Sequence, residues 1–385
     1  MYIVDGFPRI SQTFILNEIL EVQRQGIAVH VFSLDRPDEP VVHPEVAEVY
    51  HHILYAPKGR LLRLLSAHGY WFLTRPHRYL RALFYVVRHS GGHTAALFLK
   101  KIDGVSLIWR TRPDHLHAHF GQRSASLAML ASMLTGIRYT FTSHGYDIFI
   151  TPPDDYPIKT KLAKRHITVS HYNRRYLASQ FGIPDERISV IRCGVDFRPS
   201  LPRHIPLAMP RVISVARLEP VKGLDVLVQA CAVLKKGGVV FHCLIIGEGK
   251  ERVALEALIN DLGLQDVVRL AGVLPQNRVF ELLAESTVKV LSSRSEAMGV
   301  ALMEAMAIGV PVIGPQVNGV GELVEDGKEG FLVPPGDVAC LADRLKRLLL
   351  DKQLRDAFAQ RAYKKVKAQF NLECEVRKLL EIWRN

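Results

Sequence analysis

The 385-residue chain lacks the features of a secreted or membrane-spanning protein. No apolar run reaches the ~18 residues that a membrane span needs. The first residues, MYIVDGFPRI, have neither the basic start nor the long apolar core of a signal peptide, and they predict a strand. The five cysteines are odd in number and form no C-x-x-C pair, which argues against a disulfide framework or a zinc site. We therefore expect a protein of the reducing cytoplasm.

Acidic residues are missing from one long stretch. Residues 49–102 contain no Asp or Glu, but nine Lys or Arg and six His, interleaved with apolar groups such as Tyr70, Trp71 and Phe72. Of the net charge of +12, residues 1–200 contribute an excess of nine basic residues and the remainder an excess of three. Such a stretch is typical of a segment that binds an anionic membrane surface, and equally of a solvated helical face. We expect no nucleic-acid partner, because no recognised binding motif accompanies the charge.

The most informative segment is RSEAMGVALMEAMAIGVPVIGP, residues 294–315. It follows an apolar run, 288–291, that predicts a buried strand. Gly299 admits a turn, residues 300–308 predict a short helix, and a further strand starts at Val310. The backbone N–H groups of Gly299, Val300, Ala301 and Leu302 open this helix, and free N–H groups at the positive end of a helix favour a phosphate.

Two carboxylates frame this unit, Glu296 in the loop and Glu304 in the helix. Eight helical positions correspond to ~12 Å, whereas the two carboxylates of a retaining glycosidase lie about 5 Å apart. The pair therefore suits two anchors at the ends of an extended ligand. A nucleotide-sugar, with a sugar at each end and a diphosphate in the middle, fits this description. The alternative is a helix whose glutamates are only solvated.

The segment SEAMGVALMEAMAIGVPVI closely resembles the Glu-x7-Glu signature of retaining, GT-B-fold glycosyltransferases of family GT4, also called group 1. The resemblance covers most of the chain, and FPRISQTFI is similar to the form found in exopolysaccharide and colanic-acid-type members. It implies an α/β fold of two Rossmann-like domains that face a cleft. We expect an acceptor-side domain over residues 1–200 and a nucleotide-sugar-binding domain over 201–370. A helix in 371–385 would cross back to the first domain. The proline-rich segment 197–210 predicts the linker.

The resemblance also implies donor-side roles for particular residues. Glu304 would hold the ribose hydroxyls and Glu296 the sugar hydroxyls. Arg217 and Lys222 resemble the family's phosphate-binding pair, and two cations can neutralise a diphosphate. The loop GVLPQN, with Gly272 and Leu274, resembles the segment next to the nucleotide base.

A second group of residues follows strands of the first half, where ligands of open α/β sheets gather. His144 in SHGYD resembles the family's histidine that contacts the donor sugar near the leaving phosphate, and Asp147 could orient it. Possible acceptor-side residues are Arg9, Ser11, Gln12, His119 and Asp147. For the loop that holds the first three, a capped surface loop with Ser11 as the N-cap is an equal alternative. His119 has a structural role as its alternative.

The predicted reaction is transfer of a glycosyl group from a UDP- or GDP-sugar to an acceptor hydroxyl, with retention. The acceptor would be a lipid-linked or soluble saccharide, reached at the cytoplasmic face of the plasma membrane by peripheral binding. No cofactor and no metal are expected, because protein cations and N–H groups would face the diphosphate and no Asp-x-Asp motif is present. The alternatives are a sugar-nucleotide epimerase on the same fold and a non-catalytic sugar- or membrane-binding protein.

Overall fold

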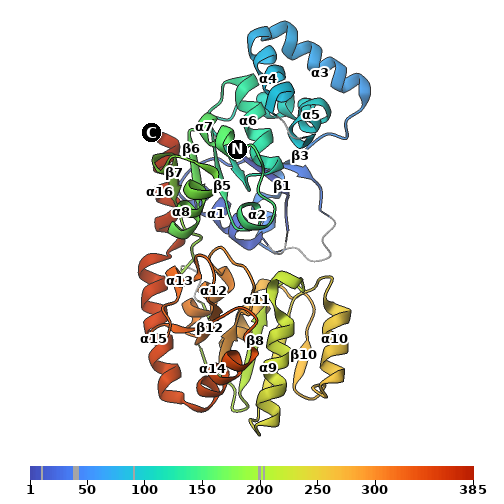
Figure 1. Cartoon of the computed structure of the whole chain (residues 1–385). Coiled ribbons are helices and arrows are strands. Elements are labelled where there is room, and N and C mark those ends of the chain that lie inside the picture. Colours follow the sequence, from blue (N-terminus) through green and yellow to red (C-terminus); the bar gives the residue numbers. More distant parts are fainter. Residues whose placement is uncertain (10–11, 38–42, 90–91, 198–200, 203) are drawn as a thin grey trace. The chain divides into compact units, whose positions relative to one another are not determined.

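The computed structural model describes residues 1–9, 12–37, 43–89, 92–197, 201–202 and 204–385, and it divides into two compact units. Unit 1 comprises Met1–Arg192 together with Val376–Asn385, and unit 2 comprises Cys193–Glu375. Each unit is built on one sheet whose strand pairs are all parallel, with its own apolar core (Figure 1). The predicted α/β class with two Rossmann-like domains is confirmed.

The sheet of unit 1 has seven strands in the order β3-β2-β1-β4-β5-β6-β7. Its central strands are buried along their length, as expected where helices cover both faces of a parallel sheet. The order reverses between β1 and β4, and such a switch point leaves a crevice at the carboxyl edge. The strands are β1 (Tyr2–Gly6), β2 (Val31–Asp35), β3 (Ile53–Tyr55), β4 (Leu116–His119), β5 (Tyr139–Ser143), β6 (Arg165–Thr168) and β7 (Ile188–Val190).

Helix α6 (Arg123–Thr135) is almost entirely buried in unit 1, because small and apolar side chains surround its axis. The other helices with seven or more residues are α1 (Thr13–Arg24), α3 (Leu61–Thr74), α4 (Pro76–His89), α5 (Gly92–Arg110), α7 (Tyr156–Leu162) and α8 (His171–Phe181). The expected cap Ser11 lies outside the described residues, and Gln12 directly precedes α1.

The basic stretch 49–102 forms most of a helical group, α3, α4 and α5, beyond the edge strand β3 (Figure 1). Trp71 of α3 is fully buried, and its indole N–H donates to Ser106 Oγ of α5 at 3.0 Å. The interpretation of Trp71 as a surface side chain is therefore wrong, because it joins two helices. In the described part of the chain, no helix combines the length and apolar character that crossing a membrane requires.

The sheet of unit 2 has six strands in the order β10-β9-β8-β11-β12-β13, which reverses between β8 and β11. The strands are β8 (Arg211–Val215), β9 (His242–Ile246), β10 (Val268–Leu270), β11 (Val288–Val290), β12 (Val312–Pro315) and β13 (Gly330–Val333). The helices are α9 (Leu224–Lys236), α10 (Arg252–Asp261), α11 (Gln276–Ala284), α12 (Val300–Ile308), α13 (Val320–Leu323), α14 (Val338–Leu350) and α15 (Lys352–Gln369). The helix predicted over 300–308 is confirmed as α12.

The last helix, α16 (Leu372–Arg384), begins in unit 2 and ends in unit 1, which includes Val376–Asn385. Trp383 donates its indole N–H to Thr140 Oγ1 at 3.1 Å and lies against the rings of Tyr2 and His117. Residues just after the first unit pair with those just before α16, through a bridge between Val195 and Asn371. Both partners belong to unit 2, which begins at Cys193 and ends at Glu375.

Candidate functional site

In unit 2, two loops leave the carboxyl ends of the neighbouring strands β8 and β11, where the strand order reverses. The loop after β8 contains Arg217 and Lys222, and the loop after β11 contains Glu296. The two loops are bound to each other: Arg294 N–H donates to Val221 O at 2.7 Å, and Ser292 Oγ donates to Lys222 O at 3.2 Å. Arg294 also pairs with Asp225 at 2.7 Å. The sheet topology therefore brings together predicted residues that are more than seventy positions apart.

Gly223 makes this approach of the two loops possible. Its φ is +57°, and a Cβ at this position would lie 2.3 Å from Ser292 O. Such a distance is too short for any side chain, and the conformation itself disfavours residues other than glycine. Gly223 thus fixes the position of the adjacent Lys222 relative to the loop that contains Glu296.

Lys222 Nζ donates to Glu296 Oε1, and Ser293 Oγ donates to the same oxygen at 2.7 Å. Both partners of this pair are mostly buried, with side chains 18% and 14% exposed. This pairing was not predicted: the family resemblance assigned Lys222 to the diphosphate and Glu296 to the sugar hydroxyls. Arg217 is exposed and makes no ion pair or side-chain hydrogen bond with any described residue, so its guanidinium is available to a ligand.

Helix α12 begins directly after Gly299, whose φ of +84° turns the chain out of the loop. Within the described residues, the N–H groups of Gly299, Val300 and Ala301 donate to no protein acceptor. The N–H of Leu302 donates to Gly299 O at 2.9 Å, so the prediction that it is free is wrong: the first turn of the helix already uses it. Three N–H groups remain for an anion at this end of the helix.

Glu304 lies one turn inside α12 and is half-buried. Burial raises the pKa of its carboxyl to about 7, while the positive charge of Lys289 and a hydrogen bond from Gln276 act in the opposite direction. Lys289, on β11, is fully buried, and burial lowers the pKa of its ammonium to about 7 against the attraction of Glu304 and Glu296. Gln276 is the first residue of α11 and follows the loop that contains Gly272 and Leu274, so the end of this loop lies near Glu304.

In unit 1, His144 directly follows β5 and is buried. Its Nε2 lies 3.0 Å from His119 Nδ1, and its ring contacts the rings of Phe14 and Phe120. Burial and the neighbouring His119 hold the pKa of His144 well below its usual range, so its imidazole is neutral near pH 7. His144 can therefore donate or accept a hydrogen bond, but it supplies no positive charge.

Asp147 does not contact the His144 ring. It accepts the backbone N–H of His144 at 2.9 Å, the N–H of Gly121 at 2.7 Å and the hydroxyl of Tyr156 at 2.9 Å, and it is fully buried. The expectation that Asp147 orients the imidazole is thus wrong, because its carboxylate fixes the backbone of the turn. Among the other predicted acceptor-side residues, Arg9 and Gln12 lie in the segment between β1 and α1, and His119 ends β4.

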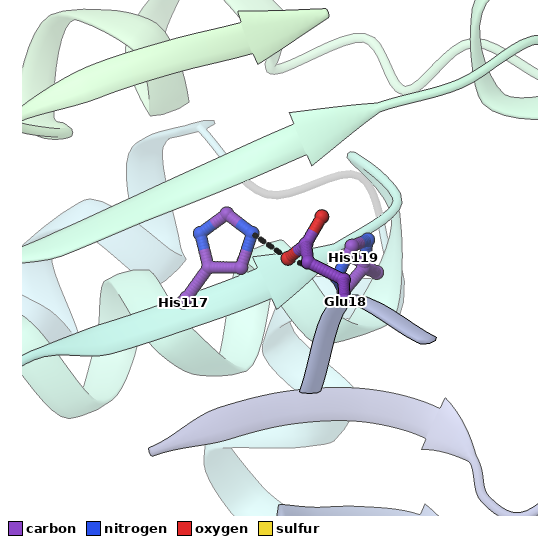
Figure 2. Close-up of side chains that lie close together, drawn as sticks. All are labelled: Glu18, His117 and His119. Carbon is purple, nitrogen blue, oxygen red and sulfur yellow. Dashed lines mark ion pairs between the residues drawn. The ribbon is translucent and has the colours of Figure 1, made fainter. Parts of the chain in front are cut away.

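Sequence reasoning missed several residues of these sites. Lys289 interrupts the apolar strand 288–291, and a lysine at such a position is itself a signal. Glu18 of α1 lies 3.2 Å from His119 Nε2 and accepts the Tyr2 hydroxyl at 2.9 Å (Figure 2). Ser293 and Gln276 left no signal, since isolated polar residues in loops and at helix starts are common.

Two family descriptions match the chain. "Glycosyltransferase Family 4" matches residues 11–198, and "Glycosyl transferases group 1" matches residues 203–365. WcaL of Escherichia coli (strain K12), named for a colanic acid biosynthesis glycosyltransferase, is 32% identical over 98% of this chain and 97% of its own. The amylovoran biosynthesis glycosyltransferase AmsK of Erwinia amylovora is 30% identical over the same shares.

Solved structures share the fold. Anabaena Alr3699/HepE, crystallised with UDP and glucose, superposes with a TM-score of 0.75 over 99% of this chain and 98% of its own, at 19% identity. A sucrose-phosphate synthase from Thermosynechococcus elongatus gives a TM-score of 0.71 over 99% and 95%, also at 19% identity. At this identity the likeness concerns the fold, which is GT-B.

Proposed function

The chain belongs to the group 1 glycosyltransferases of family 4, and from this membership we propose that it transfers a sugar from a nucleoside-diphosphate sugar to a saccharide hydroxyl, with retention, in exopolysaccharide synthesis. The names of WcaL and AmsK support the exopolysaccharide context. HepE has been crystallised with UDP-glucose, which supports a nucleotide-sugar donor. UDP and GDP are both candidate carriers.

One observation supports the donor site more than any other: groups that suit an anion converge at the switch point of the unit 2 sheet. The Arg217 side chain has no hydrogen-bond or ion-pair partner among the described residues, three N–H groups open α12, and Lys222 lies in the loop bound to that of Glu296. Charge develops on the diphosphate as its bond to the anomeric carbon breaks, and fixed positive groups stabilise that charge. We therefore assign the diphosphate to this end of α12, without a metal ion in the scheme.

The ends of the donor follow from the two carboxylates. Glu304, beside Gln276 at the start of α11, is assigned to the ribose hydroxyls. Glu296 is assigned to the sugar hydroxyls; Lys222 and Ser293 both bind its Oε1 and hold the carboxylate in place. His144 keeps the role that the family resemblance gives it, contact with the donor sugar, and its neutral imidazole suits a hydrogen bond to a hydroxyl.

A lipid-linked acceptor requires the enzyme to reach a bilayer, and the helical group of unit 1 has a suitable surface. The exposed apolar side chains of α3 and α4 recur at intervals of three, four, seven and eleven residues, so on each helix they form one stripe. Exposed basic residues, among them Arg81 and Arg88, flank the stripe of α4. The exposed apolar residues are Leu61, Leu62, Leu65, Tyr70, Phe72 and Leu73 on α3, with Leu80, Phe84 and Val87 on α4. We propose peripheral binding to anionic lipid through this apolar stripe.

A donor panel tests the reaction. We expect one or a few UDP- or GDP-sugars to raise the thermal midpoint, and incubation with a matching saccharide acceptor to give a product whose anomeric configuration, measured by NMR, equals that of the donor. An epimerised nucleotide-sugar formed without acceptor would support the epimerase instead. A midpoint raised by sugars alone, without turnover of any donor, would support a binding protein.

Vesicle co-sedimentation tests the membrane surface separately. We expect binding to rise with the fraction of phosphatidylglycerol in phosphatidylcholine vesicles and to fall with salt. Leu62→Glu with Leu73→Glu should remove binding, whereas Val253→Glu, which changes an equally exposed valine of unit 2, should not. If the wild-type protein does not co-sediment with anionic vesicles, this surface is only a solvated face, and a soluble acceptor is favoured.

A further inference from the structure

The sequence His117-Ala118-His119 places two histidines two positions apart on β4. Successive strand residues point to opposite faces of a sheet, so both imidazoles lie on the same face. Helix α1 provides Glu18 on that face, and Figure 2 shows the carboxylate between the two rings. Glu18 Oε1 is 3.2 Å from His119 Nε2 and 3.7 Å from His117 Nε2, and all three atoms lie within 4.8 Å of one another.

We propose that Glu18, His117 and His119 form a binding site for a divalent metal ion, with Zn²⁺ as the preferred ion. Two imidazole nitrogens and one carboxylate oxygen are a ligand set that zinc accepts in proteins. The assignment depends on these three residues alone and is independent of the proposed transfer reaction. It differs from the expectation that the chain has no metal site, which considered cysteine patterns and the diphosphate.

The spacing of the ligand atoms suits a tetrahedral ion. With metal–ligand bonds of ~2.1 Å, two ligand atoms of a tetrahedral zinc site lie about 3.4 Å apart. The two distances to Glu18 Oε1, 3.2 and 3.7 Å, lie on either side of that value. The distance between the ligand nitrogens of the two histidines is at most 4.8 Å and would have to shorten on metal binding. The fourth position is left for water.

The other nitrogen of each ring lies within hydrogen-bond distance of a side chain that can accept a proton. His117 Nδ1 is 2.8 Å from Thr140 Oγ1, and His119 Nδ1 is 3.0 Å from His144 Nε2. With the proton on Nδ1, each ring can donate to this partner and leave its Nε2 lone pair for the ion. The Tyr2 hydroxyl donates to Glu18 Oε1 at 2.9 Å and holds the carboxylate in place.

His119 provides an independent observation in favour of a ligand. It is fully buried, and its Nε2 makes no hydrogen bond within the described residues, since the contact with Glu18 Oε1 lacks hydrogen-bond geometry. A buried polar atom without a hydrogen bond costs stability. A metal ion between the two atoms would satisfy both. The Glu18 side chain is 17% exposed, which leaves a path by which an ion can reach the site.

Without metal, the cluster has a different bonding pattern. Thr142 Oγ1 lies 3.2 Å from His117 Nε2 and can donate its proton there. A bound ion would take that lone pair and turn the Thr142 hydroxyl away. Metal binding and a purely hydrogen-bonded network are therefore exclusive states of the same side chains, and an experiment can separate them.

The test uses the full chain without a histidine tag, expressed with added zinc and then dialysed. We expect one equivalent of zinc by mass spectrometry, and a Co²⁺-substituted protein with tetrahedral d–d absorption and no thiolate charge-transfer band. Glu18→Gln and His119→Gln should each weaken Zn²⁺ at least tenfold, measured by competition with a chromogenic chelator. The matched control His115→Gln removes an imidazole just before β4 that is no ligand, and it should stay within twofold.

Zinc should also raise the thermal midpoint of the wild type and of His115→Gln, but not of the two ligand variants. Circular dichroism checks that both ligand variants are folded. If only one of them folds, that variant alone is compared with the wild type. Wild-type protein that binds zinc no better than Glu18→Gln, or a cobalt spectrum with a thiolate band, would overturn the site. Neither result bears on donor binding, which the thermal-shift panel measures with nucleotide-sugars.

Discussion

Replacing Glu304 by alanine tests the ribose assignment. Glu304 is half-buried on α12 and accepts a hydrogen bond from Gln276, and the positive charge of Lys289 lies near. Alanine removes both carboxylate oxygens and leaves the helix intact, since alanine has the highest helix propensity. Lys289 then loses the carboxylate that favours its charged form, so the pKa of its ammonium falls below about 7 and no buried charge is left unpaired at neutral pH.

The expected loss follows from hydrogen bonds made by a charged group, which contribute about 1.5–3 kcal/mol. This corresponds to about a 10- to 150-fold weaker Kd. Because the ribose is common to all these ligands, the factor should be similar for the nucleoside, the nucleoside diphosphate and the full donor. Arg217→Ala should differ, because its guanidinium acts on the phosphates and its removal should leave the nucleoside unaffected.

Isothermal titration calorimetry with UDP, GDP and their nucleosides measures these factors. Glu256→Ala is a suitable control, because it removes a carboxylate of α10 that pairs with Arg252 at the surface of the same unit. Its affinities should remain those of the wild type. An unchanged affinity of Glu304→Ala for the preferred nucleoside diphosphate would refute ribose binding by this residue.

Three further predictions concern the same unit. Lys222→Ala should lower kcat more than it weakens binding of a nucleoside, and transfer should proceed without added Mg²⁺; a requirement for Mg²⁺ would contradict the metal-free scheme. Lys289→Met should raise the thermal midpoint most below pH 7, because the lowered pKa of Lys289 destabilises the fold where the ammonium must be charged, and this cost disappears between pH 7 and about 10.5. An equal gain at pH 6 and pH 10 would contradict that argument. Gly223→Ala should destabilise the unit by a few kcal/mol and reduce turnover, since its Cβ would lie 2.3 Å from Ser292 O; wild-type kcat and midpoint would show that the two loops can separate.

Much of the architecture could be predicted from the sequence, because it depends on local patterns. The alternation of apolar runs and polar loops located β11 and α12 to within one or two residues. The glycines at 299 and 309 marked both ends of α12, where the backbone requires a positive φ. The Glu-x7-Glu motif indicated the family, since its two glutamates lie in one contiguous stretch of sequence and can be read without the tertiary structure.

Only the tertiary structure decided which distant residues meet. The pairing of Lys222 with Glu296 depends on β8 and β11 being neighbours in a sheet, which no local pattern specifies. The burial of Trp71 depends on α5, thirty-five residues away. Glu18, His117 and His119 come from two elements about a hundred residues apart, and the sequence gives no metal-ligand spacing between them. Local propensity determines where strands and helices begin. Which side chains meet at a site depends on the spatial order of the strands in the folded sheet.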